Sequence, residues 1–228
     1  MSANYLLKLR RKSLPLASGV LAVGLASALL LSGQETPTDA RTYFPLAVGN
    51  AWRYVNSVGS ESVTQVVRLE KVNQEEGYRL ETSIGNRVIS SEVLAVRPDG
   101  IYRLAANDVP IHPPLPVLKN PLKAGDSWSF QANVKDRVIK GSLTVQSLSE
   151  PEVTRAGKFK CVKIGGDSLQ LENQKAALTT WYAPQIGPIK ISIKIGDQET
   201  TLELVDFKSA QAPPDKSKPD AVKPDKTK

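Results

Sequence analysis

The alternation of apolar and polar side chains predicts a chain built almost entirely of β-strands. In the clearest stretch, Ile189 to Ile195, isoleucine occupies every second position and Lys or Ser lies between. This pattern is typical of an antiparallel strand with one buried face. Gly196-Asp197 comes next and favours a tight hairpin turn before another strand over Thr201 to Phe207.

Short alternating stretches bounded by Gly, Asn, Asp and Pro recur from Tyr43 onward, with hardly any sustained helical periodicity. They predict strands within 62–72, 78–82, 88–96, 101–104, 127–134, 141–148, 158–164 and 178–182, with turns at 75–77 and 98–100. Residues 169–177 fit either a strand or a short helix. We therefore expect an all-β fold, an antiparallel meander arranged as a sandwich or a half-open barrel.

One motif occurs twice. The pattern Pro-Leu-x-x-Gly-(Asn/Asp)-x-Trp-x-(Tyr/Phe) is found at Pro45 to Tyr54 and again, 76 residues later, at Pro121 to Phe130. Gly followed by Asn or Asp favours a turn, and aromatic residues two apart lie on one face of a strand. The motif predicts two related halves, 43–104 and 119–207, with about four strands each and the isoleucine hairpin added to the second.

The segment between these halves, 105–119, contains four prolines around the single histidine, His112. Proline lacks the backbone N–H that a sheet requires, so we expect this segment to be an extended link across the surface.

The net charge of +7 suggests a nucleic-acid partner until the charges are located. Residues 41–207 contain 20 Lys or Arg against 18 Asp or Glu, so most of the excess lies in the first 40 and the last 21 residues. No nucleic-acid partner is predicted, because the expected folded part is nearly neutral.

The first 33 residues have the pattern of an export signal. Four basic residues precede Lys12 or include it, and the stretch 13–33 is uncharged and mostly apolar. It fits a signal peptide cleaved after Ala26-Ser27-Ala28 or an uncleaved N-terminal helix that anchors the chain in the membrane, and both interpretations stay open. Either one predicts a periplasmic or extracellular protein, with a polar spacer at 34–42, one β-rich domain at 43–207 and a disordered Lys/Pro/Asp-rich tail at 208–228.

The residue inventory excludes several chemistries. With only His112 and Cys161, the chain lacks the ligands of a usual zinc or copper site and the partners of a Ser-His or Cys-His nucleophile. It contains no calcium-loop or nucleotide-binding glycine motif, so no metal or other cofactor is predicted. Paired carboxylates for glycoside hydrolysis stay open, and the candidates are Glu81, Glu92, Glu172 and Glu203.

Aromatic and isoleucine side chains are the candidate ligand-binding residues. Aromatic rings beside turns can stack on sugars or pack in the core, and the isoleucine face can line an apolar concavity or lie beneath a neighbouring sheet. The candidates are Trp52, Trp128, Trp181, Ile189, Ile191, Ile193 and Ile195.

Several of these motifs occur together in a known group. The chain resembles uncharacterised secreted or lipid-anchored bacterial envelope proteins in Tyr43-Phe44-Pro45-Leu46 with Gly49-Asn50 and Trp52, Pro121-Leu122 with Gly125-Asp126-Ser127-Trp128, Gly157 to Ile164, and Trp181-Tyr182-Ala183-Pro184 with Ile186-Gly187. The resemblance implies an antiparallel β-sheet protein of the cell envelope without an established activity. Unlike the lipid-anchored members, this chain has no cysteine in its leader.

The function expected is that of an exported, non-enzymatic binding or accessory module. One alternative is a carrier of lipid or another hydrophobic ligand, similar to LolA and LolB, and another is a hydrolase of envelope glycan. The partners expected are the membrane, through an uncleaved leader, and an envelope lipid, polymer or protein, which the basic tail could contact.

Overall fold

The computed structural model describes residues 38–171 and 174–210. The export leader lies outside these residues, as does the tail beyond residue 210. Twelve strands follow one another along the described chain: β1 (Ala51–Asn56), β2 (Glu61–Val72), β3 (Glu75–Ile84), β4 (Arg87–Arg97), β5 (Gly100–Ala106), β6 (Val109–Lys119), β7 (Ser127–Val134), β8 (Arg137–Thr154), β9 (Gly157–Leu171), β10 (Gln174–Ala183), β11 (Gly187–Ile195) and β12 (Gln198–Lys208). The residues that fitted either a strand or a helix belong to β9 and β10.

Tight turns join neighbouring strands. Asn73 and Gln74 between β2 and β3 have φ values of 47° and 68°, and Asn107 and Asp108 between β5 and β6 have φ values of 48° and 63°. Two residues with positive φ form the hairpin turn whose twist suits antiparallel strands. The predicted turn at 75–77 is therefore wrong, because the polar pair before it makes the turn and 75–77 belong to β3.

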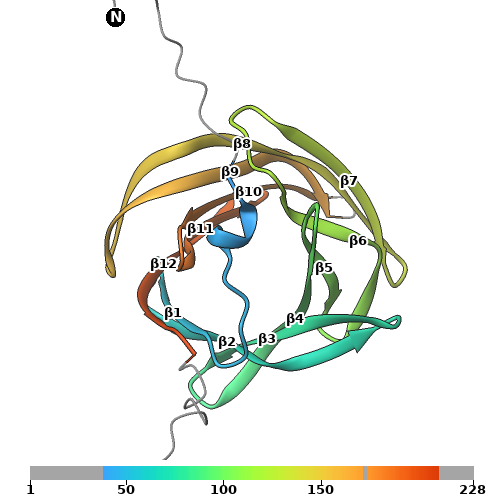
Figure 1. Cartoon of the computed structure of the whole chain (residues 1–228), viewed down its shortest axis with the longest axis horizontal. Coiled ribbons are helices and arrows are strands. Elements are labelled where there is room, and N and C mark those ends of the chain that lie inside the picture. The colour runs from blue at the N-terminus through green and yellow to red at the C-terminus, as the bar shows by residue number, and fades with distance from the viewer. Residues whose placement is uncertain (1–37, 172–173, 211–228) are drawn as a thin grey trace, which may run out of the picture. The chain divides into compact units, whose positions relative to one another are not determined.

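The sheet closes on itself. Strand β1 pairs with β2 on one side and with β12 on the other, where Ala51 lies opposite Lys208. Figure 1 shows the resulting ring of strands around a central space. The sandwich and the half-open barrel are thus corrected to a closed antiparallel barrel, in which the first and last strands satisfy each other's edge hydrogen bonds.

The proline-rich segment is part of the barrel wall, and its prediction as a surface link was wrong. Strand β6 pairs with β5 from Val109 to Lys119, with two register shifts. Its pairing with β7 is limited to Ile111 with Val134 and His112 with Asn133. Prolines are tolerated where one side of a strand makes few ladder hydrogen bonds, which explains how they fit here.

The two copies of the repeated motif form the same turn. In the first copy, Gly49 N donates to Val66 O at 2.8 Å and Val66 N donates to Asn50 O at 2.9 Å. In the second copy, Gly125 N donates to Val145 O at 2.8 Å, and Val145 N returns a bond of 2.9 Å to the Asp residue that follows the glycine. Each turn precedes a run of six strands, β1 to β6 and β7 to β12, where the sequence predicted about four.

The isoleucine hairpin was predicted correctly as β11, a turn at Gly196-Asp197 and β12. The register contains one irregularity that the sequence pattern does not reveal. Trp181 pairs with Lys190 while Tyr182 pairs with Pro188, so Ile189 is the extra residue of a β-bulge. This bulge removes Ile189 from the alternation of the other isoleucines.

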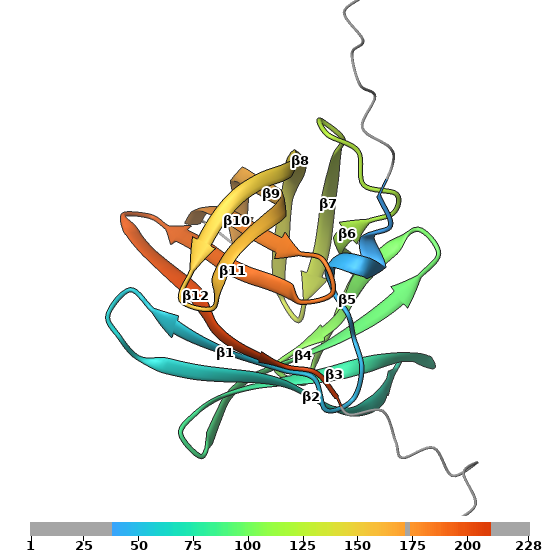
Figure 2. The same ribbon diagram turned by 60° about the vertical axis from the view of Figure 1, so that its left-hand side comes forward.

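A short N-terminal segment, 38–50, precedes β1 and packs against the barrel. It contains η1 (Ala40–Tyr43), a 3-10 helix, and Ala40 is fully buried. Thr38 forms an isolated bridge with Leu122. Part of the predicted spacer is therefore folded, and Figure 2 shows η1 beside the strands. None of the helices in the described residues is long and apolar enough to cross a bilayer.

Candidate functional site

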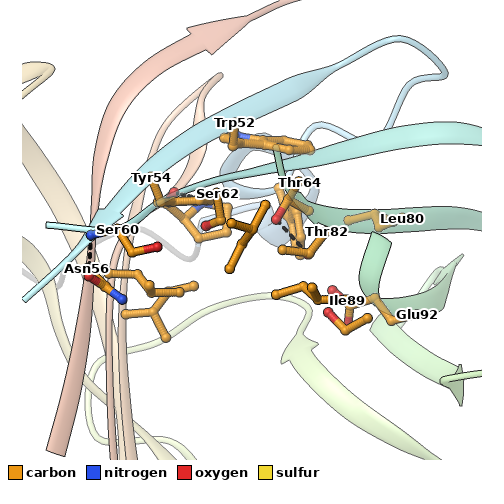
Figure 3. A pocket seen from close by; sticks show the side chains of 16 residues that line it. Trp52, Tyr54, Asn56, Ser60, Ser62, Thr64, Leu80, Thr82, Ile89 and Glu92 are labelled. Atoms are coloured by element: carbon orange, nitrogen blue, oxygen red, sulfur yellow. Dashed lines mark hydrogen bonds between the residues drawn. The ribbon is translucent and has the colours of Figure 1, made fainter. Parts of the chain in front are cut away.

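Two adjoining cavities lie among the side chains that point into the barrel. We call the first the hydroxyl cavity; it has a volume of about 350 Å³ and lies among β1 to β4, β11 and β12. Its lining combines apolar side chains with a row of polar ones: Phe44, Trp52, Tyr54, Leu80, Ile84, Ile89, Pro188, Ile191 and Leu202, with Asn56, Ser60, Ser62, Thr64, Thr82, Ser90 and Glu92. Figure 3 shows these side chains converging from neighbouring strands.

The second cavity, called the apolar cavity, has a volume of about 280 Å³. Leucine, isoleucine, valine, proline and phenylalanine supply most of its lining, which consists of Phe44, Glu92, Arg103, Leu115, Pro116, Val117, Phe130, Leu143, Ile164, Leu169, Leu178, Thr180, Tyr182, Pro188, Ile191 and Ile193. Four residues line both cavities: Phe44, Glu92, Pro188 and Ile191. The cavities therefore meet at these side chains.

The N-terminal segment helps to divide the lumen. Phe44 is 7% exposed, and its ring centroid lies 5.8 Å from that of Trp52 and 6.1 Å from that of Tyr182. The segment is held at its other contacts by hydrogen bonds, including one of 2.8 Å from Gln185 N to Thr42 O. Figure 1 shows this segment, drawn in blue, crossing the ring of strands.

Hydrogen bonds hold the aromatic lining in place. The Trp52 indole donates to Ile186 O at 2.6 Å, and the Tyr54 hydroxyl donates to Pro188 O at 2.7 Å. Their polar atoms are thus satisfied by the wall, which leaves the rings as apolar surface. Burial raises the pKa of Tyr54 well above its usual value and that of Tyr182 to about 12, so both phenols are neutral at physiological pH.

One ion pair lies where the cavities meet. Arg103 Nε on β5 donates to Glu92 Oε2 on β4 at 2.6 Å. Both side chains line the apolar cavity, and Glu92 lines the hydroxyl cavity as well. The charge of Glu92 raises the pKa of Arg103, and the pair is therefore ionised.

The hydroxyl cavity reaches the surface. Ile84 and Ile89, on either side of the turn between β3 and β4, line it and are 44% and 50% exposed. Ser60, in the turn between β1 and β2, lines the same cavity. A molecule entering at this end would pass a partly polar wall before it reached Phe44 and the ion pair.

The structure separates the predicted ligand-binding residues into two groups. Trp52, Ile191 and Ile193 line the cavities, whereas the remaining four do not appear in either lining. Ile189 is displaced by the bulge, and Ile195 lies at the end of β11, 37% exposed. The Trp128 indole donates to Pro116 O at 3.2 Å.

Trp181 belongs to a different environment. The ammonium groups of Lys163 and Lys190 lie 5.3 Å and 5.1 Å from its ring centroid. Cation–π contacts of this kind stabilise a ring between two basic side chains. Trp181 therefore has a structural role in the wall.

The carboxylates proposed for glycan hydrolysis do not meet in these cavities. Glu92 is the single carboxylate in the two linings, Glu81 accepts a bond of 2.8 Å from Arg79 Nε, and Glu203 pairs across the sheet with Val55 and Lys190. Glu172 lies outside the described residues. Within residues 38–171 and 174–210, no group of three His, Cys, Asp or Glu side chains is placed to hold a metal ion.

Sequence reasoning missed Phe44 and Arg103 as cavity residues. Phe44 had been read only as part of the motif before β1, and nothing local distinguishes a residue that enters a lumen from one that packs outside. Arg103 could be found only from the register of β4 and β5, in which Glu92 pairs with Ala106 after a shift at Val93 and Leu94.

The fold and the two cavities define a closed, twelve-stranded antiparallel barrel with a ligand-sized, largely apolar lumen. No family model matches the sequence, and no curated protein matches it. Two solved structures are similar in fold. A predicted lipoprotein from Parabacteroides distasonis ATCC 8503 is 15% identical, with a TM-score of 0.45, and the match covers 76% of this chain and all of that one. A predicted exported protein with a YmcC-like fold from Bacteroides fragilis NCTC 9343 is 16% identical, with a TM-score of 0.49, and the match covers 74% of this chain and 99% of that one. The function must therefore be argued from the residues of this chain.

Proposed function

We propose that the protein is an exported, non-enzymatic binding protein that holds one apolar or amphiphilic molecule inside its barrel. The observation that carries this proposal is the pair of adjoining cavities lined mostly by apolar side chains. A concave apolar site with a few polar groups is the usual form of a small-molecule site. The export pattern of residues 1–33 supports a location in the cell envelope, where such molecules are abundant.

The energetic argument favours a molecule with a chain of methylene groups. Each methylene group that leaves water for an apolar cavity contributes about 0.8 kcal/mol. Association costs about 4–15 kcal/mol in lost freedom, so a chain of roughly ten or more carbons is needed to offset it. The two cavities together extend through the barrel past Phe44 and Ile191, and both residues belong to both linings.

Among the alternatives, the observations favour a ligand carrier over a glycan hydrolase. A hydrolase of the usual type needs two carboxylates flanking the bond that is cut, and the linings contain only Glu92. A carrier similar to LolA and LolB needs an enclosed apolar space, which a closed barrel provides as well as a half-open one.

A binding assay tests the proposal. The purified protein should increase the fluorescence of N-phenylnaphthylamine, an uncharged hydrophobic dye, in a saturable manner with one site per chain. Ile191→Trp places a larger ring where both cavities meet and should lower the dye affinity about tenfold or more. Val153→Trp adds the same ring at a position on β8 that is 60% exposed, and it should bind the dye as the wild type does.

The outcomes separate cleanly. Saturable binding that Ile191→Trp weakens and Val153→Trp preserves supports the lumen as the site. Absence of saturable binding, together with the absence of any hydrophobe in native mass spectra of protein isolated from its own membranes, would overturn the proposal. Circular dichroism of each variant verifies that the barrel is intact.

The envelope location has its own test. Protease added to intact spheroplasts should digest the expressed protein, because residues after the leader are expected outside the cytoplasmic membrane. Full protection in intact spheroplasts, with digestion after lysis, would refute export. The N-terminal mass of the isolated protein decides between a cleaved leader and an anchor.

A further inference from the structure

The polar groups of the lumen are unevenly distributed. Serine and threonine side chains of β2, β3 and β4 line the hydroxyl cavity, including Ser62, Thr64 and Thr82. The apolar cavity contains the ion pair but few other polar side chains, among them Thr180. A ligand that matches both cavities must therefore have an apolar part and a hydrogen-bonding part.

The ion pair in the lumen is joined by one hydrogen bond, in contrast to a similar pair elsewhere in the protein. Arg97 holds Glu75 with two bonds, Nε to Oε1 at 2.8 Å and Nη2 to Oε2 at 2.7 Å. Arg103 donates to Glu92 through Nε alone. Within the described residues, no hydrogen bond is formed by the two Nη atoms of Arg103 or by Glu92 Oε1. Donors and an acceptor thus face the cavities together.

We propose that Glu92 and Arg103 form a recognition site for the uncharged, hydrogen-bonding head of an amphiphile, with its acyl chain in the apolar cavity and its head extending toward the hydroxyl cavity. This inference rests on the proposed function, which supplies the apolar ligand. A head with hydroxyl or amide groups accepts from Arg103 and donates to Glu92, and so uses both unfilled sides of the pair.

Charge complementarity selects this head over a charged one. The pair is neutral as a whole, so an anionic head that contacts Arg103 also brings its charge close to the Glu92 carboxylate. A cationic head meets the corresponding repulsion from Arg103. In a cavity with little water these interactions are weakly screened, and a net-neutral head avoids both.

The hydroxyl row gives the rest of the head its surroundings. Thr64 and Thr82 lie side by side, with their hydroxyl oxygens 2.9 Å apart (Figure 3). Each hydroxyl has a donor and acceptor capacity for more than one bond. A polyol head near Glu92 would therefore find further hydrogen-bonding partners in the direction of the exposed Ile89.

Three probes with the same twelve-carbon chain test the inference: monododecanoylglycerol, dodecanoate and dodecyltrimethylammonium, each below its micelle concentration. Displacement of N-phenylnaphthylamine gives their affinities. The wild type should bind the glyceride about tenfold or more tightly than either ion. Equal affinities for all three would overturn the recognition site and leave the proposed function intact, whereas absence of binding by every probe would overturn both.

A charge variant provides the sharper test. Glu92→Gln keeps the side chain's shape and leaves the Arg103 charge without its partner, so the preference should shift toward dodecanoate by about tenfold or more. Glu75→Gln, which removes a carboxylate from the doubly bonded pair of β3 and β4, should keep the wild-type order of affinities. An unchanged glyceride-to-dodecanoate ratio in Glu92→Gln would overturn the inference.

A double variant guards against misfolding of the single one. Glu92→Leu with Arg103→Met removes both charges and leaves no unpaired ion in the lumen. It should retain dye binding while the glyceride loses about tenfold in affinity. A double variant that binds the glyceride as tightly as the wild type would count against a role for the pair.

Discussion

Phe44 offers the most direct test of the barrel's interior, because it belongs to the segment that precedes the first strand. Its side chain is 7% exposed and lies between Trp52 and Tyr182. Truncation of a buried Phe to Ala costs about 3–5 kcal/mol in the free energy of unfolding. Phe44 lines both cavities, so part of its ring already lacks packing partners. We therefore expect the lower value, about 3 kcal/mol, for Phe44→Ala.

Urea unfolding followed by tryptophan fluorescence measures this change. The midpoint should fall while the slope with urea stays constant, because the variant alters stability without altering the area that unfolding exposes. For a domain of this size the expected loss corresponds to a decrease of about 6–12 °C in the melting temperature.

Val58→Ala is the matched control. Val58 lies in the turn between β1 and β2 and is 85% exposed, so its truncation should change stability by less than about 0.5 kcal/mol. A loss of less than about 1 kcal/mol in Phe44→Ala would mean that the segment is not held in the lumen, and it would remove the boundary between the two cavities.

Three further predictions concern the barrel wall. Gly100→Ala should be at least about 2 kcal/mol more destabilising than Gly85→Ala, because a Cβ at Gly100 overlaps a main-chain carbonyl oxygen of β6 whereas Gly85 faces open space; equal midpoints in urea would contradict this. Trp128→Phe removes the indole hydrogen bond that links β7 to β6 and should cost about 1 kcal/mol and speed amide exchange in β6, and unchanged exchange would argue against this link. Burial raises the pKa of Tyr182 to about 12, so stability should be constant below about pH 10 and fall between about pH 10 and 12, as the unfolded chain releases this proton first. Ionisation of all six tyrosines near pH 10 in a folded sample, seen by ultraviolet absorbance, would refute the last prediction.

Local sequence determined the hairpins. The alternation of Ile191, Ile193 and Ile195 and the Gly196-Asp197 turn that follows act between near neighbours in the chain, and the structure contains that hairpin. The repeated motif likewise predicted a turn, and the hydrogen bonds at Gly49 and Gly125 have the same pattern. Both features depend on backbone conformations that a few adjacent residues decide.

Only the tertiary structure decided closure, the place of the prolines and the site. Pairing of β1 with β12 joins residues more than 140 positions apart, and no local pattern indicates it. Strand β6 accommodates its prolines because its pairing with β7 is short, a property of its neighbour and not of its own sequence. Glu92, Arg103 and Phe44 meet because strand register and a returning segment bring them together. Such contacts arise from pairing across the whole sheet, so the sequence determined the elements and the closed barrel determined the cavity.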